Sequence, residues 1–276
     1  MSKGVLIFAY NSKLDYVSIA ALAAKLVKKH LGLPVTLVTD TDQVDTTIFD
    51  TVIVQPRVGQ SFERIFKFGN STEKVQWHNG NRSNAYDLSP YDQTLLLDAD
   101  YLMFNDSLKY LFDTDLDFSC YDQVHDISGS GALQRGAHIG NPGIRMQWAT
   151  AVYFTKSPLA AGVFSMMQSI KDNYDYYATL YNFTPELFRN DYTMSIALQA
   201  LTGYSGTNFS AIPGALITAN TGMEIVEART NGEIVFSWQH GDQPTKITKI
   251  KNTNIHIMNK KNITDPDVIA QLWRLT

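Results

Sequence analysis

The stretch TLLLDADYLMF, residues 94–104, decides the fold and poses the first chemical question. Its leucines form a continuous apolar run, which is typical of a strand buried on both faces of a sheet. Two carboxylates, Asp98 and Asp100, follow this run with Ala99 between them, and apolar residues come after. A buried carboxylate without a partner is strongly destabilising. We therefore expect a positive charge to compensate this pair.

The residues before this stretch predict an α/β fold. Continuous apolar runs with the length of buried strands occur at residues 4–10, 35–40 and 51–55. Residues 14–32 show helical periodicity, with Ser12 and Asp15 as a candidate capping box and Gly32 as the expected C-terminal cap. Strands that alternate with a helix at this spacing predict a parallel sheet with helices on its faces.

The second half of the chain is less regular. Strands are predicted at residues 115–121, 148–154 and 253–259, helices at 82–88, 158–171, 185–201 and 264–275, and a hairpin at 223–239. Asn231 and Gly232 form the expected two-residue turn of that hairpin. Residues 122–147 are rich in Gly, Ser and His without periodicity, and we expect a functional lid there. The sequence predicts one domain across residues 1–276.

The composition describes an ordinary globular protein. Hydrophobic residues make up 44% and charged residues 18% of the chain. The net charge of −4 argues against a broad surface for nucleic acid, although a local basic patch is compatible with it. Cys120 is the single cysteine, so an internal disulfide is excluded. With no basic and apolar leader and no apolar run of membrane-span length, we expect a cytoplasmic protein without membrane contact.

The spacing of Asp98 and Asp100 favours a metal site. Residues i and i+2 of a strand point to the same side, so both carboxylates face one point. In open α/β sheets the carboxyl ends of strands form the ligand crevice. A hard divalent ion there would compensate both charges. The alternative is that one Asp caps a turn while the other is solvated.

Two enzyme families have an Asp-x-Asp pair at the end of a strand. In the haloacid-dehalogenase-like phosphatases the pair closes the first strand, and a Thr or Val usually follows two residues later. Here the pair lies far from the first predicted strand, and Leu102 takes that later position. The match to this family is therefore weak.

The stretch RSNAYDLSPYDQTLLLDADYLMFNDSLKYLF, residues 82–112, resembles the GT-A glycosyltransferases of family 8, the glycogenin-like and galactosyltransferase-like group. The residues that match the family's order are Arg82, Tyr86, Leu88, Tyr91, Asp98 and Asp100. The family more often has Lys in place of Arg82. The resemblance covers most of residues 5–112, and this N-terminal half is also similar to glycosyltransferases carried by tailed bacteriophages.

The resemblance implies a GT-A fold, a Rossmann-like single domain with a mixed central sheet flanked by helices. It implies that residues 1–112 bind a nucleotide sugar and that residues 113–276 bind the acceptor. It also implies that Asp98 and Asp100, with Ala99 between them, hold Mn²⁺ or Mg²⁺ against the diphosphate of the donor. The ion would stabilise the charge that the departing nucleoside diphosphate gains.

Further donor contacts follow from the same resemblance. Tyr10 and Asn11 would meet the base and the ribose, although Tyr10 also fits a core position. Asp40 would bond a uracil-like edge or the ribose, and a turn cap is the alternative. Arg82 would reach the phosphates or the donor sugar and assist catalysis, and a solvated helix residue is its alternative.

The late stretch NIHIMNKKN resembles the family's strand that carries a histidine followed by a lysine. His256 would be the third metal ligand, where a lone histidine is otherwise a packed or surface residue. Lys260 or Lys261 would neutralise phosphate, although the family's Lys-Pro-Trp motif is missing. Asp191, in FRNDYTMS, would contact the donor sugar or the reacting centre, and the alternative is that Asn190 or Asp191 caps a helix.

The sequence therefore predicts a metal-dependent glycosyltransferase that uses a nucleotide sugar, a UDP-sugar first, and retains the donor's anomeric configuration. A saccharide or small molecule is the expected acceptor, and a modified DNA base is the alternative. Two other functions stay open: a nucleotidyltransferase that makes nucleotide sugars and a non-catalytic sugar-nucleotide binder. The stretch FAYNSKLD lacks the Gly-rich loop typical of such nucleotidyltransferases. The oligomeric state is left open.

Overall fold

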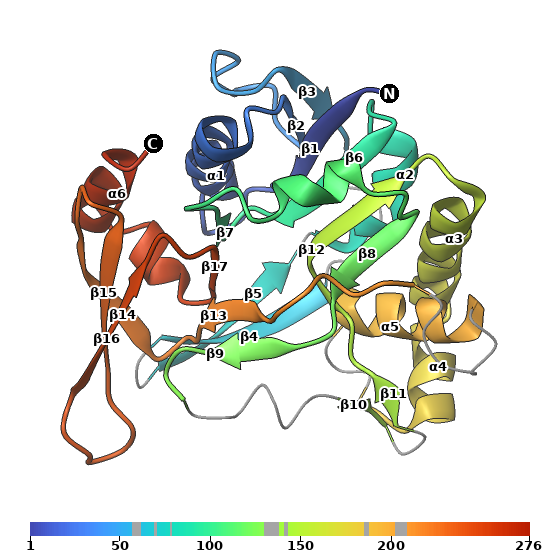
Figure 1. The fold of residues 1–276 in the computed structure, drawn as a ribbon. Coiled ribbons are helices and arrows are strands. Elements are labelled where there is room, and N and C mark those ends of the chain that lie inside the picture. Colours follow the sequence, from blue (N-terminus) through green and yellow to red (C-terminus); the bar gives the residue numbers. More distant parts are fainter. Residues whose placement is uncertain are drawn as a thin grey trace.

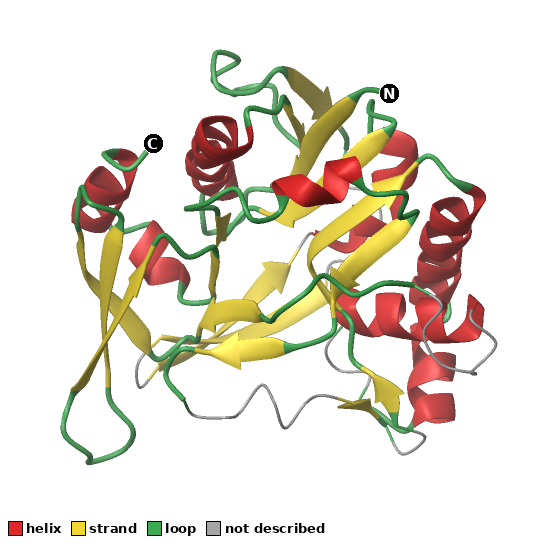
Figure 2. Cartoon of the chain, in the orientation of Figure 1, coloured by secondary structure: helices red, strands yellow, loops and turns green. Residues whose placement is uncertain are grey.

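The computed structural model of the chain describes residues 1–56, 62–68, 71–77, 79–129, 138–140, 143–184, 188–201 and 209–276. Strands β4 (Phe62–Phe68) and β5 (Ser71–Trp77) pair antiparallel, and only their backbone is described. Figure 2 shows helices on both sides of the central strands.

A mixed sheet forms the centre of the molecule (Figure 1). Its strands lie in the order β3 (Thr51–Val54), β2 (Val35–Thr39), β1 (Lys3–Phe8), β6 (Gln93–Asp98), β12 (Trp148–Thr155) and β8 (Phe118–Tyr121). Strands β3, β2, β1 and β6 run parallel, whereas β12 runs antiparallel to β6 and β8. The apolar residues of β1 and β6 are buried, as expected for parallel strands covered on both faces. The predicted α/β fold with a mixed central sheet flanked by helices is confirmed.

Helices cover the two sides of this sheet. The α-helices are α1 (Tyr16–Leu31), α2 (Ala85–Leu88), α3 (Pro158–Asp172), α4 (Tyr174–Tyr181), α5 (Asn190–Leu201) and α6 (Pro266–Trp273). Short 3₁₀ helices are η1 (Asn79–Asn84), η2 (Lys109–Asp113) and η4 (Lys260–Ile263). In the view of Figure 1, α1 lies to the left of the sheet, and α3 and α5 lie to its right. Within the described residues, no helix has both the length and the apolar character to cross a bilayer.

The ends of α1 show which capping signals operate. Asp15 is the N-cap residue and accepts a hydrogen bond from the backbone nitrogen of Ser18 at 3.0 Å. The predicted capping box of Ser12 and Asp15 is therefore wrong, because Asp15 is itself the N-cap residue of the helix. Gly32 adopts the left-handed conformation with φ 67° and donates to the carbonyl of Lys28 at 3.1 Å. This confirms Gly32 as the C-terminal cap.

Two smaller sheets extend the core on the left of Figure 1. One has the strand order β7 (Tyr101–Leu102), β17 (Ile255–Ile257), β13 (Leu216–Ala219) and β9 (Val124–Asp126). The other has the order β14 (Met223–Ala228), β15 (Glu233–Trp238) and β16 (Lys246–Lys251), and α6 packs against β14. Strands β10 (His138–Ile139) and β11 (Ile144–Arg145) form a separate pair. Because β7 follows β6 almost directly, the first of these sheets brings the C-terminal part of the chain to Asp98 and Asp100.

The hairpin of β14 and β15 has a longer loop than predicted. The backbone nitrogen of Arg229 donates to the carbonyl of Glu233, and that of Gly232 donates to the carbonyl of Arg229. Thr230, Asn231 and Gly232 therefore form the loop, with Gly232 at φ 80°. A loop of this kind needs a residue in the left-handed region, which explains the glycine. The predicted turn of two residues is therefore one residue shorter than the loop in the structure.

Other predicted elements differ at their ends. The helix expected at residues 185–201 begins at Asn190, and residues 185–187 lie outside the described residues. The expected lid at residues 122–147 includes β9, β10 and β11, while its residues 130–137 and 141–142 lie outside the described residues. Helix α4 and strands β4, β5, β13 and β16 were not predicted.

Candidate functional site

Asp98 and Asp100 lie at the carboxyl edge of the central sheet. Strand β6 ends at Asp98, which pairs with Phe8 at the end of β1. The chain then turns through Ala99 and Asp100 before β7 begins at Tyr101. This edge is where open α/β sheets bind their ligands. The side chain of Asp98 is 22% exposed and that of Asp100 is 9% exposed, so access is from the side of Asp98.

His256 joins the two carboxylates at this edge. One ligand atom from each of Asp98, Asp100 and His256 lies within 4.8 Å of the other two. The Nε2 atom of His256 is 3.4 Å from Oδ1 of Asp100. The structure thus brings together the three residues predicted as metal ligands, although they come from segments that lie far apart in the sequence.

Strand pairing places His256 beside Asp100. In the antiparallel pair of β7 and β17, His256 lies opposite Tyr101. The backbone nitrogen of Ile257 donates to the carbonyl of Asp100 at 3.0 Å. Because the register of two paired strands is fixed by these bonds, the separation of Asp100 and His256 does not depend on side-chain packing alone.

Each carboxylate of the pair already has a cationic partner within the protein. Nη1 of Arg82 donates to Oδ1 of Asp98, and Nζ of Lys260 donates to Oδ2 of Asp100. The side chains of Arg82 and Lys260 are only 2% and 9% exposed. Two buried ion pairs therefore supply the compensation that the sequence led us to expect for Asp98 and Asp100.

Arg82 has donors to spare after it has paired with Asp98. Its Nε and Nη2 atoms are buried and have no hydrogen-bond partner within the described part of the chain. A buried donor left unpaired costs about 1–3 kcal/mol, so these atoms favour an oxygen ligand. Helix η1 presents Arg82, and Ser83 Oγ donates to Gln168 Oε1 of α3 at 2.6 Å. The alternative of a solvated helix residue is wrong for Arg82.

Lys260 is the lysine that faces the carboxylate pair. Its Nζ also donates to the carbonyl of Ile257 at 2.9 Å. Its own carbonyl accepts from the hydroxyl of Thr264 at 2.9 Å, which fixes the backbone of η4. Lys261 is exposed. Of the two lysines considered from the sequence, Lys260 thus lies at the site.

Tyr10 and Asp40 lie together at the ends of β1 and β2. Burial raises the pKa of Tyr10, the Asn81 side chain lowers it, and the Asp40 charge raises it again, with a net upward shift. Asp40 and the η1 residue Asn81, next to Arg82, therefore lie close to the Tyr10 hydroxyl. Asn11 has a structural contact, because its Oδ1 accepts from the backbone nitrogen of Val17 at 3.0 Å.

Asp191 lies at the same edge of the sheet, one strand further along. Its Oδ1 accepts from the backbone nitrogen of Ala149 at 2.9 Å. Since Ala151 pairs with Leu97 in β6, Ala149 lies beyond the end of that strand, close to Asp98 in register. Asp191 thus links α5 to β12, a contact that helix capping does not explain.

Arg189 is a site residue that sequence reasoning missed. It donates to Oδ2 of Asp191 through Nε at 3.2 Å and Nη2 at 2.9 Å. Its guanidinium lies over the rings of Trp148 and Tyr192, 5.9 and 5.2 Å from their centroids. A cation two residues before a candidate carboxylate was the available signal. This pair holds Asp191 in one orientation.

The donor set fits a divalent cation. Two carboxylates and an imidazole suit Mn²⁺ at least as well as Mg²⁺. The partial exposure of Asp98 and His256, 22% and 16%, leaves room for further ligands from solvent or substrate. The buried spare donors of Arg82 add a place for anionic oxygen atoms. The residues present therefore fit a metal ion together with a phosphorylated ligand.

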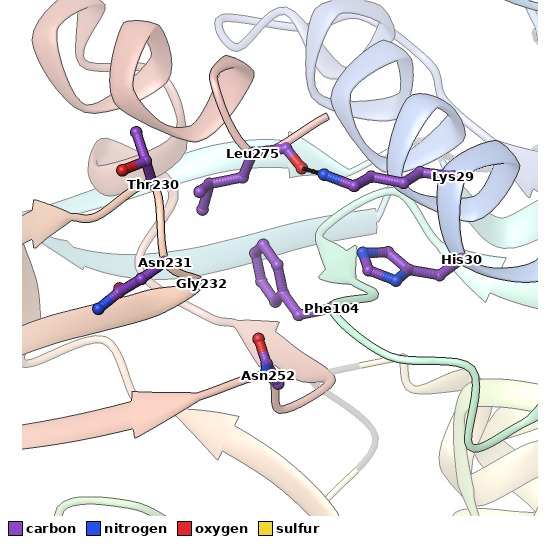
Figure 3. A pocket seen from close by; sticks show the side chains of 8 residues that line it. All are labelled: Lys29, His30, Phe104, Thr230, Asn231, Gly232, Asn252 and Leu275. Atoms are coloured by element: carbon purple, nitrogen blue, oxygen red, sulfur yellow. Dashed lines mark hydrogen bonds between the residues drawn. The ribbon is translucent and has the colours of Figure 1, made fainter.

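A pocket at the C-terminal end of α1 is distinct from this cluster (Figure 3). The described residues that line it are Lys29, His30, Phe104, Thr230, Asn231, Gly232, Asn252 and Leu275, and none belongs to the cluster. Lys29 Nζ donates to the carbonyl of Leu275 at 2.6 Å across it. We place the candidate site at the carboxylate edge, because groups of the types that bind metal ions and phosphate gather there.

Comparisons with known proteins give similarity only at the level of structure. No protein-family model matches the chain, and no curated protein matches it. Among solved structures, the glycosyltransferase GlyE of Streptococcus pneumoniae is 15% identical with a TM-score of 0.43. The alignment covers 76% of this chain and 45% of GlyE, so the chain spans less than half of that protein.

Two further solved structures are similar to the chain. The galactosyltransferase LgtC, in complex with donor and acceptor sugar analogues, is 14% identical with a TM-score of 0.45, covering 71% of this chain and 70% of LgtC. Mouse xyloside xylosyltransferase 1 is 12% identical with a TM-score of 0.41, and the alignment covers 72% of this chain and 82% of the xylosyltransferase chain. At this level of similarity, we base the functional assignment on the residues of the site.

Proposed function

We propose that this chain is a metal-dependent glycosyltransferase of the GT-A type, which transfers a sugar from a nucleoside diphosphate sugar to an acceptor. The observation that carries the proposal is the cluster of Asp98, Asp100 and His256 at the carboxyl edge of the sheet. Arg82 pairs with Asp98 of that cluster, and its Nε and Nη2 atoms are buried without a hydrogen-bond partner in the described part of the chain. Carboxylate and imidazole groups bind a divalent cation, and a guanidinium binds phosphate oxygen atoms. Together they suit a metal-bound diphosphate.

In this proposal residues 1–112 bind most of the donor, and His256 and Lys260 join them from the C-terminal part of the chain. Asp98, Asp100 and His256 hold the ion, and Arg82 donates Nε and Nη2 to phosphate oxygen atoms. When bound, Mn²⁺ or Mg²⁺ neutralises the charge that accumulates on the diphosphate as the sugar leaves. The Lys260 ammonium adds a second positive charge close to the same oxygen atoms.

The base and ribose of the donor lie over the ends of β1 and β2. Tyr10 is only 4% exposed, which fits the core position considered from the sequence, so its hydroxyl and not its ring is the group proposed to meet the donor; burial raises its pKa and keeps the phenol neutral. Asp40 accepts hydrogen bonds from the ribose or from a uracil edge, which makes a UDP-sugar the first donor to test. Asn11 and Ala99 are the remaining residues that we assign to donor binding.

Residues 113–276 supply the acceptor side. The contacts of Asp191 with Arg189 and with the backbone of Ala149 support its assignment to this side. We assign it to the donor sugar and to the positive charge that develops at the anomeric carbon, with retention of configuration. A saccharide or small molecule is the proposed acceptor, and a modified DNA base is the alternative.

The experiment is donor turnover measured with and without Mn²⁺. Purified protein is incubated with a panel of UDP-sugars, and the release of UDP is followed in each. We expect slow release that requires Mn²⁺ and that is lost in His256→Ala. Pyrophosphate release from a nucleoside triphosphate and a sugar phosphate would instead show a nucleotidyltransferase. Tight binding of the UDP-sugar without any release would show a non-catalytic binder.

A further inference from the structure

We infer that Lys260 is an internal counter-ion that competes with the metal for Asp100, so that metal and diphosphate bind this site as a pair. This inference rests on the proposed function and specifies how its site is filled. It starts from the observation that both carboxylates of the cluster are paired with cations of the protein itself.

The first step is the charge of the cluster. Asp98 and Asp100 carry two negative charges, and their direct partners Arg82 and Lys260 carry two positive charges. The set is therefore neutral before any ion arrives. A divalent cation that enters a neutral, largely buried set of charges meets the repulsion of one ammonium group and one guanidinium group at close range. We therefore expect the metal alone to bind weakly.

The second step is the difference between the two cations. Arg82 is 2% exposed, and η1, which carries it, packs against α3. Lys260 carries its charge at the end of a flexible four-carbon stem, while its backbone is fixed in η4. Only its side chain needs to move for Nζ to leave Oδ2 of Asp100. Lys260 is therefore the cation that exchanges partners.

The third step is where the Lys260 ammonium goes. Asp100 offers Oδ1 on the side of His256 and Oδ2 to Lys260. An incoming diphosphate carries oxygen anions that replace Asp100 as the partner of the ammonium. The carboxylate of Asp100 is then free to bind the metal, because its negative charge is no longer compensated by Lys260. Each ligand thus prepares the site for the other, which is positive coupling, and coupling of this kind is reciprocal.

The test is a titration of Mn²⁺ into the full chain, alone and with saturating UDP, by calorimetry or by the electron spin resonance of free Mn²⁺. In the unsubstituted protein we expect UDP to raise the affinity for Mn²⁺ by a factor of about 5–150. In Lys260→Met, Mn²⁺ alone should bind about tenfold more tightly, and the effect of UDP should shrink by a similar factor. Lys261→Met removes the same charge from the exposed neighbour and should match the unsubstituted protein.

Several results would overturn the inference. Mn²⁺ affinity that is equal with and without UDP in the unsubstituted protein excludes coupling. A Lys260→Met variant that binds Mn²⁺ no better than Lys261→Met excludes competition. Lys260→Gln, which keeps a donor for the Ile257 carbonyl without the charge, serves if Lys260→Met does not fold, and the same shift is expected. A protein that binds neither Mn²⁺ nor UDP would instead contradict the proposed function.

Discussion

The side-chain oxygen of Asn254 accepts a hydrogen bond from the backbone nitrogen of Phe104 at 2.7 Å, across a sequence separation of 150 residues. It also accepts from the nitrogen of Asn105, and its Nδ2 donates to Ser107 Oγ at 3.1 Å. Because Asp100 precedes this loop and His256 lies two residues after Asn254, these bonds reinforce the strand pairing that places the two proposed metal ligands together. Asn254, a polar residue two positions before His256, was the available sequence signal for this contact.

Substitution of Asn254 should therefore weaken metal binding through the backbone that carries the proposed ligands. In Asn254→Ala we expect a loss of about 1–3 kcal/mol in the free energy of unfolding, because the buried amides of Phe104 and Asn105 lose their acceptor. We also expect Mn²⁺ affinity with UDP to fall by about tenfold or more, as for other groups that orient metal ligands. Urea denaturation and a Mn²⁺ titration measure the two effects.

Thr253→Ala is the matched control for Asn254→Ala. The hydroxyl of Thr253 donates to the carbonyl of Lys251 at 2.9 Å on the exposed side of the same segment. Its loss should leave the affinity for Mn²⁺ unchanged. A normal metal affinity in a folded Asn254→Ala variant would show that strand pairing alone positions His256.

Removal of the carboxylate at position 100 should affect folding as well as metal binding. Asp100→Asn leaves the buried ammonium of Lys260 without its charged partner, which costs about 3–5 kcal/mol for pairs of this kind. The double variant Asp100→Asn with Lys260→Met removes both charges, so most of this loss should return. Neither variant should release UDP with Mn²⁺, because the metal ligand is missing in both.

Thermal denaturation of the unsubstituted protein, Asp100→Asn, Lys260→Met and the double variant forms a complete cycle. A coupling energy near zero would mean that the pair of Asp100 and Lys260 is absent in solution. Mn²⁺-dependent UDP release by Asp100→Asn at the rate of the unsubstituted protein would remove Asp100 from the proposed site.

The central strands and the carboxylate edge could be predicted because local patterns determine them. Three buried leucines before Asp98, and Gly32 after the periodicity of α1, are signals read within a few residues. The edge followed from the rule that ligands meet the carboxyl ends of parallel strands. The resemblance to family 8 supplied His256, whose place beside Asp100 depends on the pairing of β7 with β17.

The two buried ion pairs could not be predicted from local patterns. Lys260 meets Asp100 across a separation of 160 residues, and only the tertiary fold brings them together. A lysine and an arginine also look like surface residues in a sequence, since these types are rarely buried unless paired. Two kinds of cation can therefore compensate Asp98 and Asp100, a metal ion and the protein's own side chains, and the sequence led us to consider only the metal ion.

The free energy of unfolding should depend on pH through Asp50. Burial alone would raise the pKa of this carboxyl, but the backbone nitrogen of Val35 and the Lys28 ammonium, at 2.8 and 2.9 Å, lower it below its ordinary value of 3.8. A carboxyl with a depressed pKa in the folded state stabilises the protein above pH 3.8. That contribution is lost as the pH falls through the folded-state pKa.

Asp50→Asn should remove this part of the pH dependence. Since the Asp50 side chain is 43% exposed, we expect a loss of about 1 kcal/mol or less at neutral pH and a smaller difference below pH 3.8. Urea denaturation at the two pH values measures it, with Asp42→Asn as the control for the same change of charge. A constant difference between Asp50→Asn and the unsubstituted protein at both pH values would contradict the assignment.

The contacts of Asp191 lead to an expectation for the stereochemistry of the proposed transfer. The Arg189 guanidinium and the Ala149 amide hold both of its oxygen atoms, which suits a fixed negative charge better than a base that must take up a proton. We therefore expect the product to keep the anomeric configuration of the donor. In Asp191→Asn, turnover should fall by about a hundredfold while the affinity for the UDP-sugar stays within a small factor, because a charge that stabilises the transition state is lost.

Asp175→Asn, in the exposed first turn of α4, is the control. Proton NMR of the first product gives the anomeric coupling, and inversion from an α-linked donor would make Asp191 the catalytic base instead.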